Sequence, residues 1–290
     1  MLSLDLFLNA IVAGLLIGGF YAAVSLGISV TFGLLDVANI AHPVFVILGA
    51  YTAFTLNSAY GTDPLVAGLV FAPVFFLVGV AVYQFYYASF ERKGESPLRG
   101  LVFFFGLLFI VEVALSLKFG VDYRLIEAPY IGESVHIGPV GIAFRLLVPC
   151  VVGLLMTFAL YLFLGKTFYG RAIMGVAQDS LALRLVGADP IRIKTLAFGL
   201  GIATASVAGA LLIMISPVEP SIGRAYIGRV FAITVLGGLG SIGGTLTAAM
   251  ILGVAESLTS TFSGPSWAQA VSFGLLLLVL AIRPAGLFGR

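Results

Sequence analysis

The sequence predicts an all-α polytopic membrane protein with about eight membrane spans. Hydrophobic residues make up 60% of the 290 residues and charged residues only 10%, whereas a soluble domain carries about 25% charge. The charged residues are clustered, so long uncharged segments remain between them. About 20 apolar residues cross the hydrocarbon core as a helix, and these segments lack the strict alternation of barrel strands.

Eight segments are long enough to span a bilayer. Six of them contain no Asp, Glu, Lys or Arg: 6–35, 64–90, 146–165, 195–218, 230–255 and 257–282. The other two are 37–62, which holds His42, and 100–118, which holds Glu112 and Lys118. The run that begins at Leu6 is too long for a cleaved signal peptide and lacks a basic region before it. No polar segment could form a separate domain, so we expect one transmembrane domain over residues 1–290.

The positions of lysine and arginine predict which side each loop faces, because short loops rich in these residues stay in the cytoplasm. The basic loop near Arg92 is therefore expected in the cytoplasm. The loop 119–143, where acidic residues outnumber Arg124, is expected outside; these acidic residues are Asp122, Glu127 and Glu133. Residues 216–228 are expected outside again and the basic C-terminus inside. Counting the membrane crossings back from these loops (the span parity) favours an external N-terminus. A further break near Asp36 would add a crossing and place the N-terminus in the cytoplasm.

A polar island, residues 166–194, lies between two uncharged spans. Its basic residues outnumber its acidic ones: Lys166, Arg171, Arg184, Arg192 and Lys194 against Asp179 and Asp189. This excess predicts a cytoplasmic loop. Apolar residues at four-residue spacing predict a helix that Gly187 ends; they are Ile173, Ala177, Leu181 and Leu185. Asp189 followed by Pro190 is typical of the start of the next helix. A structured cytoplasmic helix indicates a docking surface for a partner.

A run of glycines interrupts the segment 230–256. Its members are Gly237, Gly238, Gly240, Gly243 and Gly244. Each glycine costs about 1 kcal/mol in a helix relative to alanine, and span parity requires this segment to begin and end outside if 266–282 is the last span. A re-entrant hairpin satisfies both conditions. Because exposed backbone at membrane depth is tolerated only against protein or water, we predict that these glycines line the substrate path. Close helix packing by small residues is a compatible alternative.

A second break, residues 33–43, interrupts the first half of the chain. Asp36 or Asn39 is predicted to cap the following helix, and Pro43 suits its first turn. Asn39 and His42 are candidate pathway residues if this break lies at membrane depth, and cap or surface residues if it lies in a loop. Each break precedes a helix rich in small residues, which suggests an internal repeat of the kind found in many transporters.

Other polar residues in apolar surroundings are weaker candidates for a functional role. Glu112 is a candidate functional carboxylate, with a structural role near the interface as the favoured alternative. Gln84 and Glu256 are expected near the ends of spans. Cys150 is expected to be a small buried residue, and a single cysteine forms no disulfide framework.

Several function classes lack support in the sequence. There is no phosphate-binding loop of the Gly-x-x-x-x-Gly-Lys-Ser/Thr type. The two histidines, His42 and His136, are too few for a metal cluster, and no Ser–His–carboxylate pattern or nucleic-acid platform is present. We therefore expect no enzyme activity, no metal, no cofactor and no nucleic-acid partner in this chain.

Four motifs, in order along nearly the whole chain, resemble the branched-chain amino acid ABC transporter permease family. They are Tyr21–Gly33 with Asn39-Ile40-Ala41-His42 and Leu48–Tyr51; Gly170–Gly187; Val235–Thr245; and Arg283–Gly289. The family commonly has glycine after the histidine, where this chain has Pro43, which stiffens the turn. Urea and short-amide permeases share the same pattern, and a stand-alone secondary transporter is the main rival.

The resemblance implies a set of partners and a location. Two cytoplasmic ATPase subunits would hydrolyse ATP, an external binding protein would deliver substrate, and a second, related permease subunit would pair with this chain rather than a second copy of it. The permease would lie among lipids of the bacterial inner membrane. The resemblance also identifies the island as the ATPase-docking loop, through Arg171, Ala177, Gln178, Asp179, Arg184 and Gly187.

Overall fold

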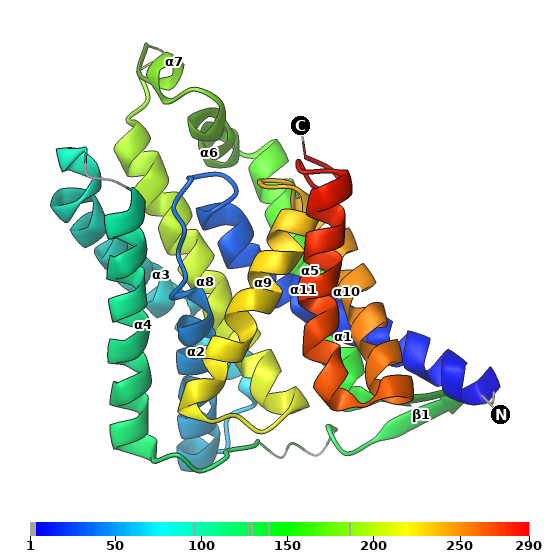
Figure 1. The fold of residues 1–290 in the computed structure, drawn as a ribbon. Coiled ribbons are helices and arrows are strands. Elements are labelled where there is room, and N and C mark those ends of the chain that lie inside the picture. The colour runs from blue at the N-terminus through cyan, green and yellow to red at the C-terminus, as the bar shows by residue number, and fades with distance from the viewer. Residues whose placement is uncertain are drawn as a thin grey trace.

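The structure, a computed structural model, describes residues 4–94, 97–126, 128, 130–138, 140–185 and 187–289. Glu127 and Val186, which belong to predicted loops, lie outside these residues. The helices form a bundle with two ends (Figure 1). The end that carries α6 (Phe168–Gln178), α7 (Ser180–Leu185) and the C-terminus is here named the α6 end. The opposite end carries the N-terminus and the antiparallel strands β1 (Ser134–Ile137) and β2 (Val140–Ala143), and is named the β1 end.

Long helices connect the two ends. They are α1 (Leu4–Thr31), α2 (His42–Tyr60), α3 (Pro64–Ser89), α4 (Pro97–Phe119), α5 (Phe144–Lys166), α8 (Pro190–Ile215), α9 (Gly223–Gly237), α10 (Ile242–Ser263) and α11 (Pro265–Ile282), with short 3-10 turns η1 (Glu91–Lys93) and η2 (Pro220–Ile222). Within the described residues, 7 are long and apolar enough to cross a membrane; α2 and α9 are not among them. This confirms the predicted all-α polytopic class, with about eight spans as an approximate count.

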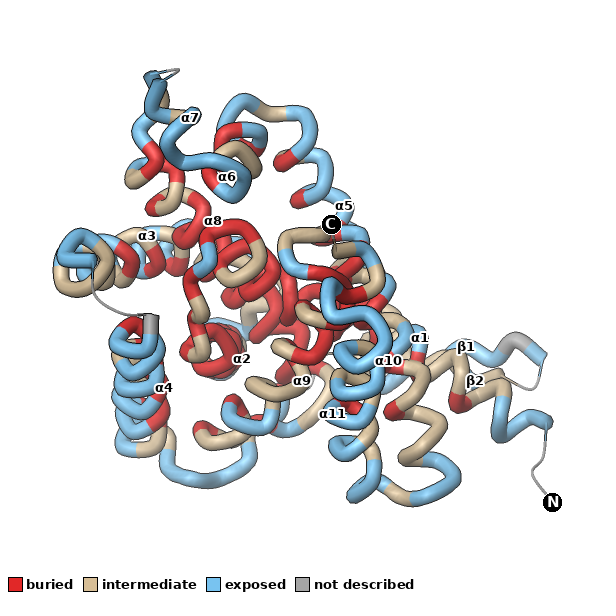
Figure 2. The backbone as a smooth tube through the Cα atoms, turned by 45° about the horizontal axis from the view of Figure 1, so that its top comes forward, coloured by how far each residue is buried: buried red, intermediate tan, exposed pale blue. Residues whose placement is uncertain are grey.

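The core of the bundle forms around α1 and α8, whose windows of highest hydropathy are 67% and 78% buried. Helix α8 packs against α1, α2 and α3, and buried residues concentrate there (Figure 2). Small residues permit these contacts: a Cβ atom on Gly209 would collide with the backbone of Val46 and Ala50, as expected where membrane helices approach closely. By contrast α3, α4, α5 and α11 turn apolar side chains outward, which suits lipid or another subunit.

Helix α1 also packs along α10, although the two helices lie at opposite ends of the sequence. A Cβ atom on Gly14 would lie 2.6 Å from the Cα atom of Val254. The Ser257 hydroxyl donates a hydrogen bond of 2.7 Å to the Ala10 carbonyl. The first helix is therefore held by a helix near the end of the chain.

The glycine run does break the segment 230–256, into α9 and α10. Both arms have their outer ends toward the β1 end (Figure 1), as a hairpin requires. Helix α10 continues past Glu256 to Ser263 and α11 begins at Pro265, which agrees with a last span over 266–282; only the expectation that Glu256 lies near the end of a span was wrong. Glu256 is buried inside α10, and it can lie there because Arg229 pairs with its charge.

The first break is also present, between α1 and α2. Asp36 adopts a φ of 57°, the left-handed conformation, shortly after α1 ends. Helix α2 begins at His42 with Pro43 in its first turn, as predicted, but its N-cap is Ala41, so the predicted capping by Asp36 or Asn39 was wrong. The Asn39 side chain instead accepts a hydrogen bond of 3.2 Å from the Ala41 amide, just before the helix.

Candidate functional site

The two chain breaks touch each other. A Cβ atom on Gly33 would collide with the Gly240 backbone nitrogen, and one on Gly240 would lie 2.8 Å from the Gly33 carbonyl oxygen. One turn away, the hydroxyls of Ser29 and Thr245 share a hydrogen bond of 2.9 Å. The backbone contact brings together segments more than half the chain apart, so a movement of one break must disturb the other.

The predicted pathway glycines have different roles in the turn between α9 and α10. Gly238 and Gly240 adopt φ values of 95° and 79° and form the turn itself, since only glycine populates this region freely. Gly237 and Gly244 bring the backbones of α9 and α10 into contact, as the packing alternative predicts. Gly243 is exposed and has nothing within 4 Å of its Cβ position.

A pocket of about 690 Å³ opens beside this turn. It is lined by Gly33 and Leu34 of the first break, by Gly240 and Gly243 of the second, by residues of α5, and by Ala177 and Gln178 of α6. Its size is within the range of small-molecule sites. Two predicted pathway glycines and two predicted docking residues therefore share one pocket, which the sequence did not indicate.

The last described residues close the end of α9. The Leu287 amide donates to the Leu236 carbonyl at 2.8 Å, and the Phe288 amide donates to the Gly237 carbonyl at 3.2 Å. A helix leaves its final carbonyls without partners inside the helix. These bonds satisfy two of them, so the motifs Val235–Thr245 and Arg283–Gly289 form one structural unit.

Asn39 and His42 are completely buried, at 0% exposure. The His42 Nε2 lies 3.0 Å from the Val24 carbonyl oxygen, which can only accept, so this nitrogen donates. The ring packs against Gly27, where a Cβ atom would collide with it. Asn39 Nδ2 and His42 Nδ1 have no hydrogen-bond partner within the described residues. Neither residue lines the pocket beside the glycine turn.

The polar island folds as two helices rather than the single helix that the apolar spacing predicts. Thr167 caps α6 by accepting a hydrogen bond of 3.0 Å from the Gly170 amide. Asp179 ends α6 and caps α7, because its carboxylate accepts from the amides of Leu181 and Ala182 at 2.8 and 3.0 Å. Gly187 follows α7 with a φ of 85°, as a helix stop requires.

The two island helices differ in burial. Helix α6 buries one face against α5 and α8, whereas α7 has no buried residue. Leu181 and Leu185 on α7 are 66% and 83% exposed. All the predicted docking residues are exposed: Arg171, Ala177, Gln178, Asp179, Arg184 and Gly187.

A buried charged cluster joins α1, α9, α10 and α11. The sequence did not predict that these side chains meet. The Glu256 carboxylate accepts hydrogen bonds from Arg229 at 2.9 Å and from the Tyr21 hydroxyl at 2.6 Å. It accepts a third bond from the Ser272 hydroxyl. The Arg229 guanidinium also lies 5.0 Å from the centre of the Tyr21 ring. Every member of the cluster has a partner, so it stabilises the helix packing.

A second ion pair connects α4 to α9. Arg224 Nη2 lies 2.9 Å from Glu112 Oε1, with side chains 53% and 12% exposed. Arg224, expected in the external loop 216–228, instead lies in the first turn of α9. The available signal was that two carboxylates, Glu112 and Glu256, and two arginines, Arg224 and Arg229, all lie within or beside apolar segments.

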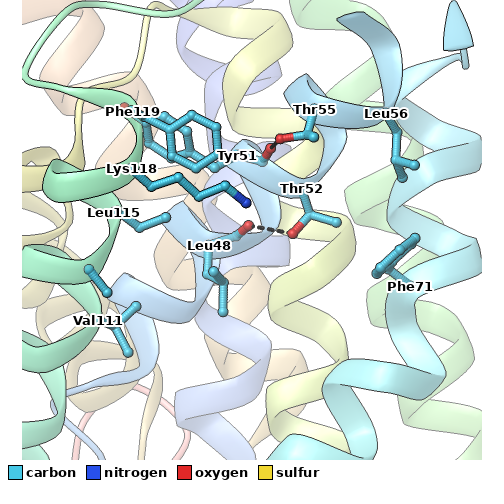
Figure 3. Close-up of a pocket in the computed structure, with 11 residues that line it drawn as sticks. Leu48, Tyr51, Thr52, Thr55, Leu56, Phe71, Val111, Leu115, Lys118 and Phe119 are labelled. Carbon is cyan, nitrogen blue, oxygen red and sulfur yellow. Dashed lines mark hydrogen bonds between the residues drawn. The ribbon is translucent and has the colours of Figure 1, made fainter. Parts of the chain in front are cut away.

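A further pocket, of about 360 Å³, lies between α2, α3 and α4 (Figure 3). Its two threonine hydroxyls are used within their own helix, because Thr52 and Thr55 donate to the carbonyls of Leu48 and Tyr51. Lys118 enters it beside Phe119. None of the predicted pathway residues is in its described lining.

Comparison with known proteins gives the family. Residues 10–280 match the family described as "Branched-chain amino acid transport system / permease component". The chain is 32% identical to the high-affinity branched-chain amino acid transport system permease protein BraD of Pseudomonas aeruginosa, over 98% of this chain and 96% of BraD.

Two proteins of Escherichia coli are also similar. The chain is 29% identical to the permease protein LivH over 98% of this chain and 96% of LivH. It is 29% identical to the permease protein LivM over 92% of this chain and 67% of LivM. No solved structure matches the chain. With its apolar helices, the chain is a multi-pass membrane protein and a transport subunit rather than an enzyme. It belongs to the permease component family of branched-chain amino acid transport systems.

Proposed function

We propose that this chain is a permease subunit of an ATP-driven importer for branched-chain amino acids in the bacterial inner membrane. The substrate is inferred from the names of BraD, LivH and LivM, which match the chain over nearly its whole length. Since LivH and LivM are two different permease proteins of one organism, we also propose a second, related permease subunit as the partner. An external binding protein would deliver the amino acid.

The proposed orientation puts the α6 end in the cytoplasm. This end carries most of the basic residues, which stay on the cytoplasmic side of membrane proteins. They include Arg92, Lys93, Arg99, Lys166, Arg171, Arg184, Arg192, Lys194 and Arg283. The glycine turn would then lie toward the cytoplasm and the β1 end would face outward.

The observation that carries the docking proposal is the exposure of two leucines on a short helix of the polar island. Leu181 and Leu185 project from α7 without covering any core. Apolar side chains exposed at a structured polar surface are typical of a protein contact. We propose that α6 and α7 together form the surface on which one ATPase subunit docks, while the other docks on the second permease.

Docking at this surface would be transmitted to the substrate path through the shared pocket. The exposed face of α6 would contact the ATPase, while Ala177 and Gln178 reach the pocket lined by Gly240 and Gly243. A shift of α6 would therefore change the space beside the contact between the two breaks. Such a coupling requires that the ATPase bind the two states of the permease with different affinity.

The docking proposal is tested by cysteine crosslinking in the assembled transporter. A cysteine at Asp179, at the junction of α6 and α7, should capture an ATPase subunit, and one at Asp122 near the β1 end should not. Gly187→Pro or Ala177→Glu should reduce leucine uptake while ATP hydrolysis continues. Absence of any crosslink from Asp179 would contradict the docking surface.

The substrate is tested by uptake into vesicles that hold the complete transporter. Leucine, isoleucine and valine should be taken up in an ATP-dependent manner, and urea should not. Uptake of urea in preference to leucine would identify the chain as a short-amide permease. Leucine uptake that persists without ATPase subunits would identify a secondary transporter.

A further inference from the structure

The Glu112–Arg224 ion pair lies within the length of the bundle rather than at its surface ends. Glu112 precedes the last residue of α4, Phe119, by seven positions, or about 10 Å of helix. Arg224 lines a pocket with Gln269, which lies about 6 Å along α11 from the start of that helix. Because a charged side chain that is half exposed at this depth is costly in hydrocarbon, this face must meet water or protein.

The Glu112–Arg224 pair has fewer hydrogen-bond partners than the Arg229–Glu256 pair. Glu256 accepts hydrogen bonds from Tyr21 and Ser272 as well as from Arg229, which leaves little capacity for a ligand. Within the described residues, no third side chain donates to the Glu112 carboxylate or accepts from Arg224. The Glu112–Arg224 pair can therefore exchange its partners without breaking a larger network.

The space beside Arg224 has the size and lining for a small molecule with an apolar part. The pocket between α9 and α11 measures about 170 Å³, or roughly the volume of six water molecules. Its polar lining is Arg224, Arg229, Gln269 and Ser272, and Phe273 adds an aromatic ring. On the other side, the Arg224 guanidinium lies 5.9 Å from the centre of the Phe109 ring. Glu112 is not in the described lining of this pocket, so the pocket offers Arg224 and Arg229 to a carboxylate and Phe273 to an apolar side chain, while Glu112 contacts Arg224 from α4, outside the pocket.

We propose that Glu112 and Arg224 form an exchangeable ion pair that opens to receive a passing amino acid. The substrate carboxylate would bind Arg224, whose guanidinium offers two parallel donors, and the substrate ammonium would bind Glu112. The exchange leaves no charge without a partner, which is the costly condition for charges removed from water. This inference rests on the proposed function and extends it, because it accounts for recognition of both charged ends of an amino acid.

The test uses the complete transporter in proteoliposomes, with the variants Glu112→Gln and Arg224→Gln and the control Arg92→Gln, an exposed residue at the α6 end. Each of the first two should reduce leucine uptake about tenfold or more, the range for losing a charged hydrogen-bond partner. Basal ATP hydrolysis and co-purification with the second permease should remain as in the wild type, whereas the melting temperature of Arg224→Gln should fall, because the buried Glu112 carboxylate loses its cation. The control should transport normally.

The double variant Glu112→Gln/Arg224→Gln separates ligand binding from a structural bridge. Two glutamines can still join α4 to α9, so restored uptake would show a structural bridge and overturn the inference. Wild-type uptake in the single variants would also overturn it, as would loss of the second permease from the complex, which would identify an interface contact. Absence of leucine uptake in the wild type would instead refute the proposed substrate.

Discussion

The buried Arg229–Glu256 pair supports a quantitative prediction about the stability of the bundle. Replacing Arg229 with methionine keeps an aliphatic chain of similar length but leaves the Glu256 carboxylate, 5% exposed, without a cation. Removing one member of a buried ion pair costs about 3–5 kcal/mol. At about 2 °C per kcal/mol for a chain of this size, the melting temperature should fall by roughly 6–10 °C.

The double variant Arg229→Met/Glu256→Met should cost less than the sum of the two single variants. It removes both charges, and the buried hydroxyls of Tyr21 and Ser272 lose their acceptor, at about 1–3 kcal/mol each. Thermal unfolding of the purified protein in detergent measures the difference. The control is Arg192→Met, whose side chain is 85% exposed beside Asp189, and which should cost less than about 1 kcal/mol. If the two single losses simply add in the double variant, the pair is not coupled and the reasoning fails.

Three further substitutions test the glycine turn, the helix packing and the buried polar residues. Gly243→Leu should fill the pocket beside the turn and block uptake without loss of assembly, because its Cβ position is open; normal uptake would exclude this pocket from the path. Gly153→Leu should prevent folding, because a Cβ atom there would collide with the backbone of α1. The control Gly106→Leu should fold, because the space around its Cβ position is open. Gel filtration in detergent distinguishes a folded from an aggregated variant. His42→Ala should reduce the maximal uptake rate more than the apparent affinity, and full activity of the double variant with Asn39→Ala would show that both residues are only structural.

Features set by neighbouring residues could be predicted from the sequence. Pro43 marks the first turn of α2, and Asp189 caps α8 with Pro190 in its first turn. Gly187 stops α7. The glycine run interrupts the segment 230–256, whose two ends were expected on the same side of the membrane. In each case the cause is local, because proline and glycine restrict or free the backbone at their own positions.

Features that depend on distant partners could not be predicted. Glu256 is expected near the end of a span because it follows the uncharged run 230–255, but Arg229 lies 27 positions away and pairs with it, so Glu256 is buried inside α10 instead. The contact between Gly33 and Gly240 likewise leaves no trace in either segment alone. Asp179 fits a continuous helix by apolar spacing, and only its capping bonds show that one helix ends there and another begins.

The packing of α1 along α10 has a consequence for how the protein is made. Ile242, where α10 begins, follows the end of α1 by roughly 210 residues. At a synthesis rate of about 5–20 residues per second, α1 waits roughly 10–40 s before its partner leaves the ribosome. During that time its small-residue face and its polar side chains, among them Tyr21 and Ser29, must be sheltered by the insertion machinery or by α2, α5 and α8 as they arrive. Assembly of this subunit is therefore completed only when the last helices return to the first.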